Sequence, residues 1–337
     1  MKFLVIGSNS FSGSHFVSSA LREGYKVFGL SRSNEPNKVF LPYRWTDSFT
    51  KGKSFSDNKF EFFRANLNND LDKIINFLHD IRPTHIVNFA SQGMVAESWL
   101  NPLDWYKTNL LSQVAFHDEL RKCKYIEKYV HVTTPEVYGS INEKWIKESN
   151  QFNPSTPYAV SRAACDMHLL SFYKAYDFPV VFTRAANVYG PGQQLYRIIP
   201  RTILSALTGK SMELHGGGDS TRSFIHINDV ISATLKIAIS ADPGTSWHIS
   251  TLESITIKDL VKKICELTSI DFNSIVKITP DRLGKDQSYL LDSSSLRKEF
   301  GWEDIISLDD GLCDTLNWVK SNLEILSQME WNYFHKS

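Results

Sequence analysis

The sequence lacks a charge imbalance, a cysteine pattern and a long hydrophobic run. Its 37 basic and 37 acidic residues cancel, so no basic surface for nucleic acid or an anionic membrane is predicted. The four cysteines lie far apart without a CxxC pair, which is typical of reduced thiols. The opening MKFLVIG is too short for a signal peptide, and no apolar window is long enough for a membrane span. We therefore expect a cytoplasmic protein with neither nucleic-acid nor membrane partners.

Short apolar runs alternate with amphipathic segments in the first half of the chain. Strands are predicted at residues 2–7, 26–31, 59–65, 85–90 and 128–134. The segments between them, such as 70–81 and 102–123, have the periodicity of helices, while 39–58 is expected to be a surface loop. Continuous apolar strands joined by helices are typical of a parallel sheet covered on both faces. The sequence thus predicts an α/β protein with a doubly wound parallel sheet.

The pattern changes near residue 187, which suggests two domains. We expect a first domain over 1–186 and a smaller C-terminal α/β lid over 187–337, with some crossing of the chain between the two. In the second part Thr256 is placed to cap a helix over 257–268, with Asp259 at its third position. The short run at 246–250 is read as a strand of the lid.

The stretch GSNSFSG follows the first predicted strand and opens the first helix. Gly7 would make the tight turn, and Gly13 would let the helix pack against the strand. The backbone amides between them would then face a pyrophosphate at the helix N-terminus. Ser10 stands where the middle glycine of such a motif usually lies. Glycines are also common in ordinary turns, so the dinucleotide-binding prediction depends on the position of this stretch between a strand and a helix.

The second predicted strand ends in GLSRS, without the acidic residue that would bind the ribose hydroxyls of NAD. Ser31 and Arg32 instead offer a hydroxyl and a cation, which suit a 2′-phosphate. We therefore predict NADP, with NAD as the alternative if Arg32 is only a solvated loop residue. Asn66 and Leu67, after the third strand, lie where an adenine edge would be met.

PYAVSR places Tyr158 and Arg162 four residues apart, and therefore on one face of a helix. A free tyrosine has a pKa near about 10 and is a poor base at neutral pH. A fixed cation beside it favours the phenolate. This pair is the candidate for proton transfer.

Six motifs occur in the order found in extended short-chain dehydrogenase/reductases, the NAD-dependent epimerase/dehydratase family. They are NFASQGMVAESWLNPLDWYKTN, TTPEVYGS, PYAVSR, RAANVYGPGQ, GGGDSTRSFIHINDV and DRLGKDQSYLLD with a later FGW. The chain most resembles nucleotide-sugar 4,6-dehydratases of the dTDP-glucose type. The resemblance implies a Rossmann fold, a nucleotide-activated hexose as substrate, and Phe11, Phe89 and Ala90 as further cofactor contacts. It departs from the family at Arg162, where lysine is usual.

The resemblance also assigns roles at the reacting end. Thr134 would polarise the C4 oxygen of the sugar, and Glu136 would take the C5 proton once C4 is a ketone. Pro135 replaces the aspartic acid that protonates the departing C6 hydroxyl in dTDP-glucose enzymes. We expect a 4,6-dehydratase; the alternatives are an epimerase, a 4-dehydrogenase, a 5,6-dehydratase, or a catalytically retired dinucleotide-binding regulator.

Substrate contacts and assembly follow from the same resemblance. Ser98, Asn187, Arg222 and Lys285 match positions near the sugar and its diphosphate, Arg222 as the cation that neutralises it. A homodimer is expected through helices over 102–123 and 158–176. These helices carry many apolar residues, namely Trp105, Leu111, Val114, Phe116, Met167, Leu170 and Phe172.

Overall fold

The computed structural model describes residues 1–45, 59–139, 145–280 and 290–336. The strands of its main sheet are β1 (Lys2–Ile6), β2 (Lys26–Ser31), β3 (Phe60–Arg64), β4 (His85–Asn88), β5 (Lys128–Val132), β6 (Val180–Ala185) and β11 (Ser246–Ile249). Within the described residues these seven strands are all parallel, in the order β11-β6-β5-β4-β1-β2-β3. The order reverses at β1, which is the position where open α/β sheets bind ligands.

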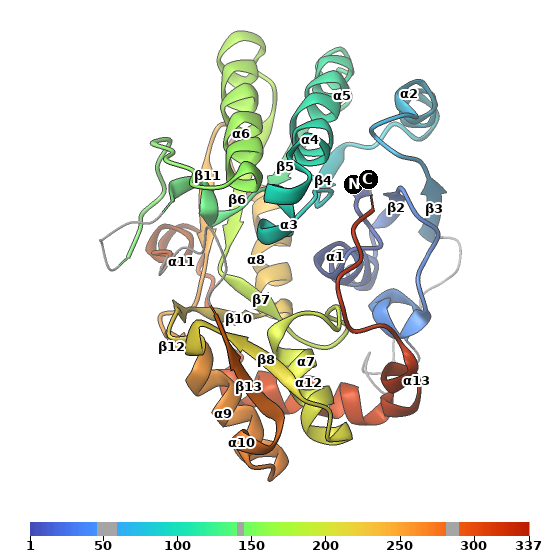
Figure 1. Cartoon of the computed structure of the whole chain (residues 1–337). Helices are drawn as coiled ribbons and strands as arrows, with labels where there is room; N and C mark the ends of the chain where they lie inside the picture. The colour runs from blue at the N-terminus through green and yellow to red at the C-terminus, as the bar shows by residue number, and fades with distance from the viewer. Residues whose placement is uncertain (46–58, 140–144, 281–289, 337) are drawn as a thin grey trace.

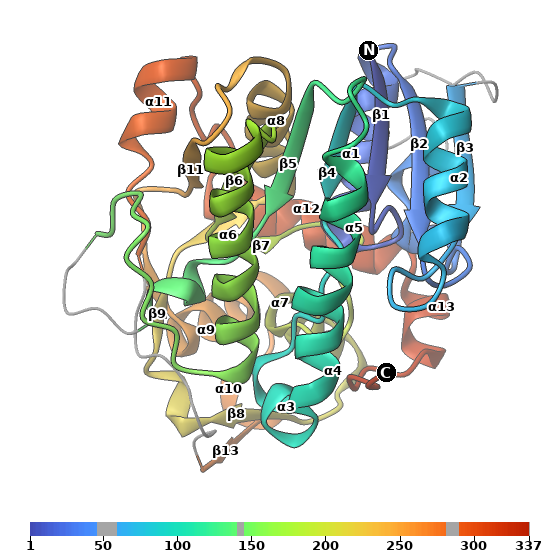
Figure 2. The ribbon, with the colours of Figure 1, turned by 90° about the horizontal axis from the view of Figure 1, so that it is seen from above.

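Helices cover both faces of this sheet (Figure 2). Helices α1 (Phe11–Arg22) and α8 (Ile227–Ser240) pack on one face, and α2 (Leu71–Ile81), α5 (Ser112–Leu120) and α6 (Pro157–Tyr176) pack on the other. Successive side chains of a strand point to opposite faces. Accordingly Phe3 and Val5 join the core under α1, whereas Leu4 and Ile6 join the core under α2 and α5. The predicted doubly wound α/β fold is confirmed.

Most of the chain after residue 187 forms the lid, which lies below the sheet in Figure 1. Its strands pair two by two: β7 (Asn187–Tyr189) with β10 (Phe224–His226), β8 (Met212–His215) with β13 (Val276–Thr279), and β9 (Thr221–Arg222) with β12 (Ile255–Thr256). Its helices are α7 (Ile198–Thr208), α9 (Ile257–Thr268), α10 (Phe272–Ile275), α12 (Leu308–Ser321) and α13 (Leu323–Gln328). Ile203, Leu260 and Trp318 are central in their shared core.

The chain crosses back from the lid to the sheet. Helix α8 packs on the sheet, and β11 pairs with β6. Helix α11 (Ser294–Phe300) then covers β11. The strand expected in the lid at 246–250 therefore belongs to the main sheet, because its apolar residues complete the core beside β6.

The remaining described elements are short helices and turns. They are α3 (Val95–Leu100), α4 (Pro102–Tyr106), the π-helical turn η4 (Lys107–Leu111) and the 3₁₀ turns η1 (Lys38–Phe40), η2 (Pro42–Arg44), η5 (Pro135–Tyr138) and η6 (Gly216–Gly218). All four cysteines are free thiols. In the part of the chain that is described, every helix is too short or too polar to cross a membrane.

Candidate active site

A cavity of about 1430 Å³ lies between the carboxyl ends of the strands and the lid. Its walls come from the loop after β1, the end of β5, the start of α6, and β7 and β9 of the lid. Predicted site residues that line it are Ser10, Phe11, Arg32, Phe89, Thr134, Glu136, Tyr158, Arg162, Asn187 and Arg222. The fold therefore gathers residues that lie more than 200 positions apart in the sequence.

The loop between β1 and α1 requires its two glycines. Gly7 has a φ of 78°, and a Cβ there would lie 2.9 Å from the backbone nitrogen of Ala90. A Cβ on Gly13 would lie 2.1 Å from the carbonyl oxygen of Gly7. Ser10 caps α1, since its Oγ accepts a hydrogen bond of 3.1 Å from the Gly13 amide. The first turn of α1 is thereby held against the strand ends, with Ser10 and Phe11 at the cavity.

Two arginines lie near each other at the ends of the neighbouring strands β2 and β3. Arg32 lines the cavity, and Arg64 of β3 donates from Nε to the carbonyl oxygen of Arg32 at 3.4 Å. Ser31 faces the glycine loop instead, where its Oγ accepts from the backbone amide of Asn9 at 3.0 Å. Arg64 was not among the predicted site residues, although its place at the end of the neighbouring strand could have indicated it.

Three other predicted cofactor residues lie behind the cavity wall. Leu67 is buried in the core under α2. The backbone amide of Asn66 donates to the Asp70 carboxylate at 2.8 Å, and the backbone amide of Ala90 donates to the side-chain oxygen of Asn88 at 2.9 Å. They shape the strand ends without lining the cavity in the described structure.

Thr134, Glu136 and Tyr158 converge on the cavity from two elements. Thr134 caps η5, where its Oγ1 accepts from the amide of Glu136 at 3.4 Å. Tyr158 is the second residue of α6, which begins with Pro157 and is capped by Thr156. The buried phenol is hydrogen-bonded to the Thr134 hydroxyl. The hydroxyls of Thr134 and Tyr158 and the carboxylate of Glu136 therefore belong to residues that line the same cavity.

The phenol of Tyr158 holds its proton in this structure. Burial raises its pKa to about 12, and the negative charge of Glu136 adds to the rise. The charge of Arg162 and the hydrogen bond from Thr134 lower the pKa, but they do not outweigh burial. A further positive charge in the cavity would be needed to make this phenol a base at neutral pH.

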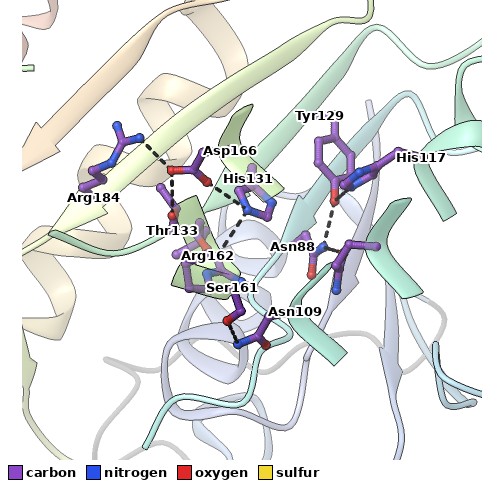
Figure 3. Close-up of polar contacts among 12 residues, drawn as sticks. Asn88, Asn109, His117, Tyr129, His131, Thr133, Ser161, Arg162, Asp166 and Arg184 are labelled. Carbon is purple, nitrogen blue, oxygen red and sulfur yellow. Dashed lines mark hydrogen bonds and ion pairs between the residues drawn. The ribbon is translucent and has the colours of Figure 1, made fainter. Parts of the chain in front are cut away.

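Arg162 is 2% exposed and lies beside His131 (Figure 3). Its Nη2 donates to the carbonyl oxygen of Val132 and lies 3.3 Å from Nε2 of His131. Its Nε and Nη1 are buried and, within the described residues, have no hydrogen-bond partner. Arg162 also lines the cavity, although these two nitrogens are themselves buried.

A buried carboxylate completes the network behind Arg162. Asp166 accepts from Arg184 at 2.7 Å and from Thr133 at 3.0 Å, and its other oxygen lies 3.4 Å from Nε2 of His131. Burial alone would raise the Asp166 pKa, but the charge of Arg184, the contact with His131 and the charge of Arg162 together outweigh it and hold the pKa below its usual value. Burial and the charge of Arg162 lower the pKa of His131 to about 4. At neutral pH the network is one anion, two cations and a neutral imidazole.

A second buried chain joins the loop after β4 to α6 (Figure 3). Asn109 donates to the hydroxyl of Ser161 at 3.0 Å, and Ser161 donates to the carbonyl oxygen of Tyr158 at 2.7 Å. Asn109 also accepts from the amide of Gln92 at 2.8 Å. The position of Tyr158 is thus tied to Gln92, which lines the cavity.

The lid supplies polar groups opposite Tyr158. Arg222, on β9, is nearly buried, and Asn187, on β7, donates to the carbonyl oxygen of Ser223 at 3.3 Å. Ser98 is buried in α3 and donates to the carbonyl oxygen of Val95 at 2.6 Å, so its hydroxyl is turned away from the cavity. Lys285 lies outside the described residues.

Several cavity residues had no signal in the sequence. Glu97, on α3, has a buried Oε2 without a hydrogen-bond partner among the described residues. Arg197 and Tyr196, before α7, and Tyr333, near the end of the chain, also line the cavity. Glu97 lies within the motif at 88–109 but was not singled out there, whereas the other three come from segments outside the six motifs, so only the folded chain brings them to the site. No group of three potential metal-binding side chains occurs in the described ranges.

Comparison with known proteins places this geometry in a family. A family model described as GDP-mannose 4,6 dehydratase matches residues 4–315. The chain belongs to this family. Individual dTDP-glucose 4,6-dehydratases also match the chain, and the family resemblance drawn from the motifs is confirmed.

Individual members of the GDP-mannose 4,6 dehydratase family differ in length. A trifunctional UDP-glucose 4,6-dehydratase/3,5-epimerase/4-keto-L-rhamnose-reductase of Arabidopsis thaliana is 30% identical over 95% of this chain, but this chain covers only 47% of that protein. The chain therefore spans about half the length of this relative and a smaller share of a second, similar relative. The dTDP-glucose 4,6-dehydratase of Streptomyces niveus is 28% identical over 96% of this chain and 94% of its own.

A solved structure supports the same conclusion about the fold. The dTDP-glucose 4,6-dehydratase of Streptomyces venezuelae, crystallised with NAD, superimposes with a TM-score of 0.85 at 27% identity. The match covers 96% of this chain and 98% of that one. The sheet and the lid are therefore both shared with this enzyme.

Proposed function

We propose that the chain is an NAD(P)-dependent nucleotide-sugar 4,6-dehydratase. In this proposal the cavity holds a dinucleotide over the glycine loop and a nucleotide-activated hexose between Tyr158 and the lid. The observation that carries it is the convergence of Thr134, Glu136 and Tyr158 on one volume. The dinucleotide, when bound, supplies the acceptor for the C4 hydride and its later donor to C6.

The side chains have separate tasks in this reaction. Tyr158 takes the proton of the C4 hydroxyl, and the Thr134 hydroxyl bonds the same oxygen. Oxidation at C4 makes the C5 proton acidic, and Glu136, beside Tyr158, removes it. Water then leaves from C5 and C6, and return of the hydride gives a 4-keto-6-deoxy sugar. The hydride is taken from and returned to the same molecule, so the reaction needs no external oxidant.

Because Pro135 replaces the usual aspartic acid, the departing C6 hydroxyl lacks its usual proton donor. Proline has no acidic side chain, so another group must protonate the leaving oxygen. Glu136 could return the proton that it has taken from C5, and Glu97 is a second carboxyl at the cavity. If neither does so, no water is lost and the chemistry stops at C4 oxidation or C5 epimerisation. If water is lost but the hydride returns to C4, the product is a 5,6-alkene. A regulator that binds dinucleotide without turnover is the remaining alternative.

For the cofactor we propose NADP, with NAD as the alternative. Arg32 at the cavity and Arg64 beside it favour a 2′-phosphate. The Streptomyces venezuelae relative holds NAD, which favours the alternative. The substrate is a nucleotide-activated hexose, and Arg222 is proposed as the partner of its diphosphate.

Product mass and solvent deuterium at C5 together decide between these reactions, because a 4-keto-6-deoxy sugar and its 5,6-alkene isomer have the same mass. The purified chain, supplied with NAD or NADP, would be incubated with UDP-, dTDP-, GDP- and CDP-hexoses. We expect a product lighter by one water, with deuterium from solvent at C5. An unchanged mass with deuterium at C5 would indicate an epimerase, and no reaction with any sugar would indicate a regulator.

The variant Glu136→Gln isolates the proposed base. Its C4 oxidation depends on Tyr158 and Thr134, so substrate should still produce the absorbance of reduced nicotinamide. Deuterium incorporation at C5 and water loss should both stop. Incorporation at the parent rate would show that another group takes the C5 proton.

A further inference from the structure

The last described residues, 329–336, return from α13 to the cavity (Figure 1). Trp331 anchors the start of this segment. Its ring is buried, its Nε1 donates to the carbonyl oxygen of Leu326 at 2.8 Å, and the guanidinium of Arg201 lies 5.4 Å from its ring centre. This end of the segment is therefore fixed to the lid.

The far end of the segment is attached to the other wall of the cavity. The His335 ring stacks on the buried Trp105 ring of α4, with centroids 5.0 Å apart and an angle of 13° between the planes. His335 Nε2 lies 2.7 Å from a carboxylate oxygen of Asp104. The side chain of Gln92, in the loop after β4, donates to the carbonyl oxygen of Lys336 at 2.6 Å.

Between these ends the segment crosses the dinucleotide loop. The Tyr333 ring packs edge-on against Tyr196, with centroids 5.3 Å apart. Burial raises the pKa of Tyr333, and the nearby charge of Arg32 opposes that rise. Arg32 follows β2 and Gln92 follows β4, while β1 lies between these two strands. A segment that reaches both must pass over the end of β1, where the glycine loop begins; Figure 2 shows it there, between α4 and α13.

The space beneath the segment remains open. Tyr333, Phe334 and Lys336 line the same cavity of about 1430 Å³ as Ser10 and Arg32. The ring of Phe334 is 78% exposed, which leaves an apolar surface facing a potential ligand. The segment therefore covers the place of a dinucleotide without filling it.

We propose that residues 329–336 form a strap that closes over the bound dinucleotide, with Trp331 as its fixed end and His335 as its latch. The proposal rests on the dinucleotide site proposed above. Because the ligand must pass the strap to leave, the latch contacts of His335 with Trp105 and Asp104 control the rate of release. Phe334 and Tyr333 then become part of the wall of the dinucleotide site.

Release kinetics test the strap. The full chain would be loaded with NADPH or NADH, and release would be followed by nicotinamide fluorescence after mixing with excess oxidised dinucleotide. His335→Ala removes a hydrogen bond to a carboxylate and a ring stack, so release should become faster by about tenfold. A chain that ends after Asn332 keeps Trp331 and should release at least as fast.

The matched control is Ile325→Ala, an exposed residue of α13 that is remote from the cavity lining. It should release at the parent rate, and all variants should keep the parent melting temperature. Unchanged release in both strap variants would overturn the strap alone. Tighter binding through faster association would also overturn it, because the segment would then be a plug that the dinucleotide displaces. No binding by the parent chain would overturn the proposed dinucleotide site as well.

Hydrogen exchange supplies a readout that does not depend on activity. Amides of residues 329–336 should exchange more slowly when dinucleotide is bound, because the ligand holds the strap closed. Faster exchange on binding would mean that the ligand expels the segment, and would contradict the proposal.

Discussion

The guanidinium of Arg162 is a buried cation whose orientation is fixed by the sheet. One nitrogen is bonded to the carbonyl oxygen of Val132 and lies beside His131, and that histidine in turn lies beside Asp166. The planar fork of arginine has two further nitrogens, which are buried and have no hydrogen-bond partner among the described residues. Arg162 thus places a positive charge near Tyr158, while its contacts with Val132 and His131 fix its position.

Substitutions of Arg162 separate its charge from its shape. Arg162→Lys keeps the cation that lowers the Tyr158 pKa and should change rate and dinucleotide affinity only modestly. Arg162→Met removes the cation, so the pKa of Tyr158 should rise further and C4 oxidation at pH 7 should fall by orders of magnitude. The rate of cofactor reduction, measured from pH 6 to 10 (roughly the range in which a perturbed phenol ionises), checks both.

The two variants also distinguish an active site from a retired one. With Arg162→Met, the pH at which activity appears should move upward. A methionine variant as active as the parent would show that the cation does not activate Tyr158. If only the lysine variant reduced cofactor, the parent would be a dinucleotide-binding regulator.

Arg32 and Arg64 test the preference for NADP. Arg32→Ala should weaken NADP binding by about 1.5–3 kcal/mol, the contribution of a charge-assisted hydrogen bond, and leave NAD binding nearly unchanged. Arg64→Ala is the companion variant, since Arg64 lies beside Arg32 without lining the cavity, and its loss should matter less. Calorimetric titration of both dinucleotides measures the effect. Equal losses for NAD and NADP would show that Arg32 does not bind the phosphate.

At the scale of elements, helix caps and strand positions were predicted correctly where they depend on residues that are close in the sequence. Thr256 caps α9 as expected, accepting from the Asp259 amide at 3.0 Å while its hydroxyl donates to the Asp259 carboxylate at 2.7 Å. The strands of the first half are found where apolar runs indicated them. Such features depend on residues within one turn or one strand, so the sequence contains the information directly.

Features that depend on distant contacts were not predictable. Residues 39–58 were expected at the surface, yet Val39 is buried in the lid core and its carbonyl oxygen accepts from Trp318, 279 positions away. Residues 46–58 lie outside the described ranges. The same holds for the site: Thr134, Glu136 and Tyr158 have motifs, whereas Tyr196 and Tyr333 reach the cavity through tertiary packing alone.

The close packing of α1 against the loop after β1 gives a testable prediction about stability. Gly13→Ala would place a methyl group 2.1 Å from the Gly7 carbonyl oxygen, so helix and strand must separate. We expect a loss of stability of about 1–3 kcal/mol or more, together with loss of dinucleotide binding. Gly93→Ala is the control for stability, because a Cβ there would have 4.0 Å to its nearest neighbour. Urea unfolding compares them; a Gly13→Ala chain as stable as the parent would contradict the close packing.

At the scale of the whole molecule, buried histidines link stability to pH. Burial lowers the pKa of His15 and His248 to about 3 and that of His131 to about 4. Below about pH 6.5 these histidines bind protons in the unfolded chain but stay neutral in the folded one. The free energy of unfolding should therefore fall as the pH drops from 6.5 toward 4. One histidine shifted as far as His131 corresponds to roughly 3 kcal/mol across that window.

Urea unfolding at pH 7.5 and pH 5 checks this linkage. The free energy of unfolding should be lower at pH 5 for the parent chain. His248→Gln should reduce the difference, since the imidazole, which contacts Tyr138 and the carbonyl oxygen of Ile146, is removed. His79→Gln alters an exposed histidine and should leave the difference intact. Equal stability of the parent at both pH values would contradict neutral burial of these rings.

The remaining prediction concerns assembly. Of the apolar residues expected at a dimer interface, Trp105 and Phe116 are buried within the chain itself, which corrects their assignment to a partner. Leu111 and Met167, however, are 63% and 60% exposed. Leu103 of α4 and Leu100 of α3 are also exposed, and these helices lie beside α6 on the outer side of the sheet (Figures 1 and 2).

We expect this apolar helix face to pair with its copy in a homodimer. A self-complementary patch of this kind is buried by two-fold symmetry, and a stable interface of roughly 800 Å² per partner needs several such residues. Sedimentation at micromolar concentration should give a dimer, and Leu111→Glu combined with Met167→Glu should give a folded monomer. Ile305→Glu, an equally exposed apolar position between α11 and α12, should leave the dimer intact. A parent chain that sediments as a monomer would refute the pairing, and the exposed leucines would then need another partner.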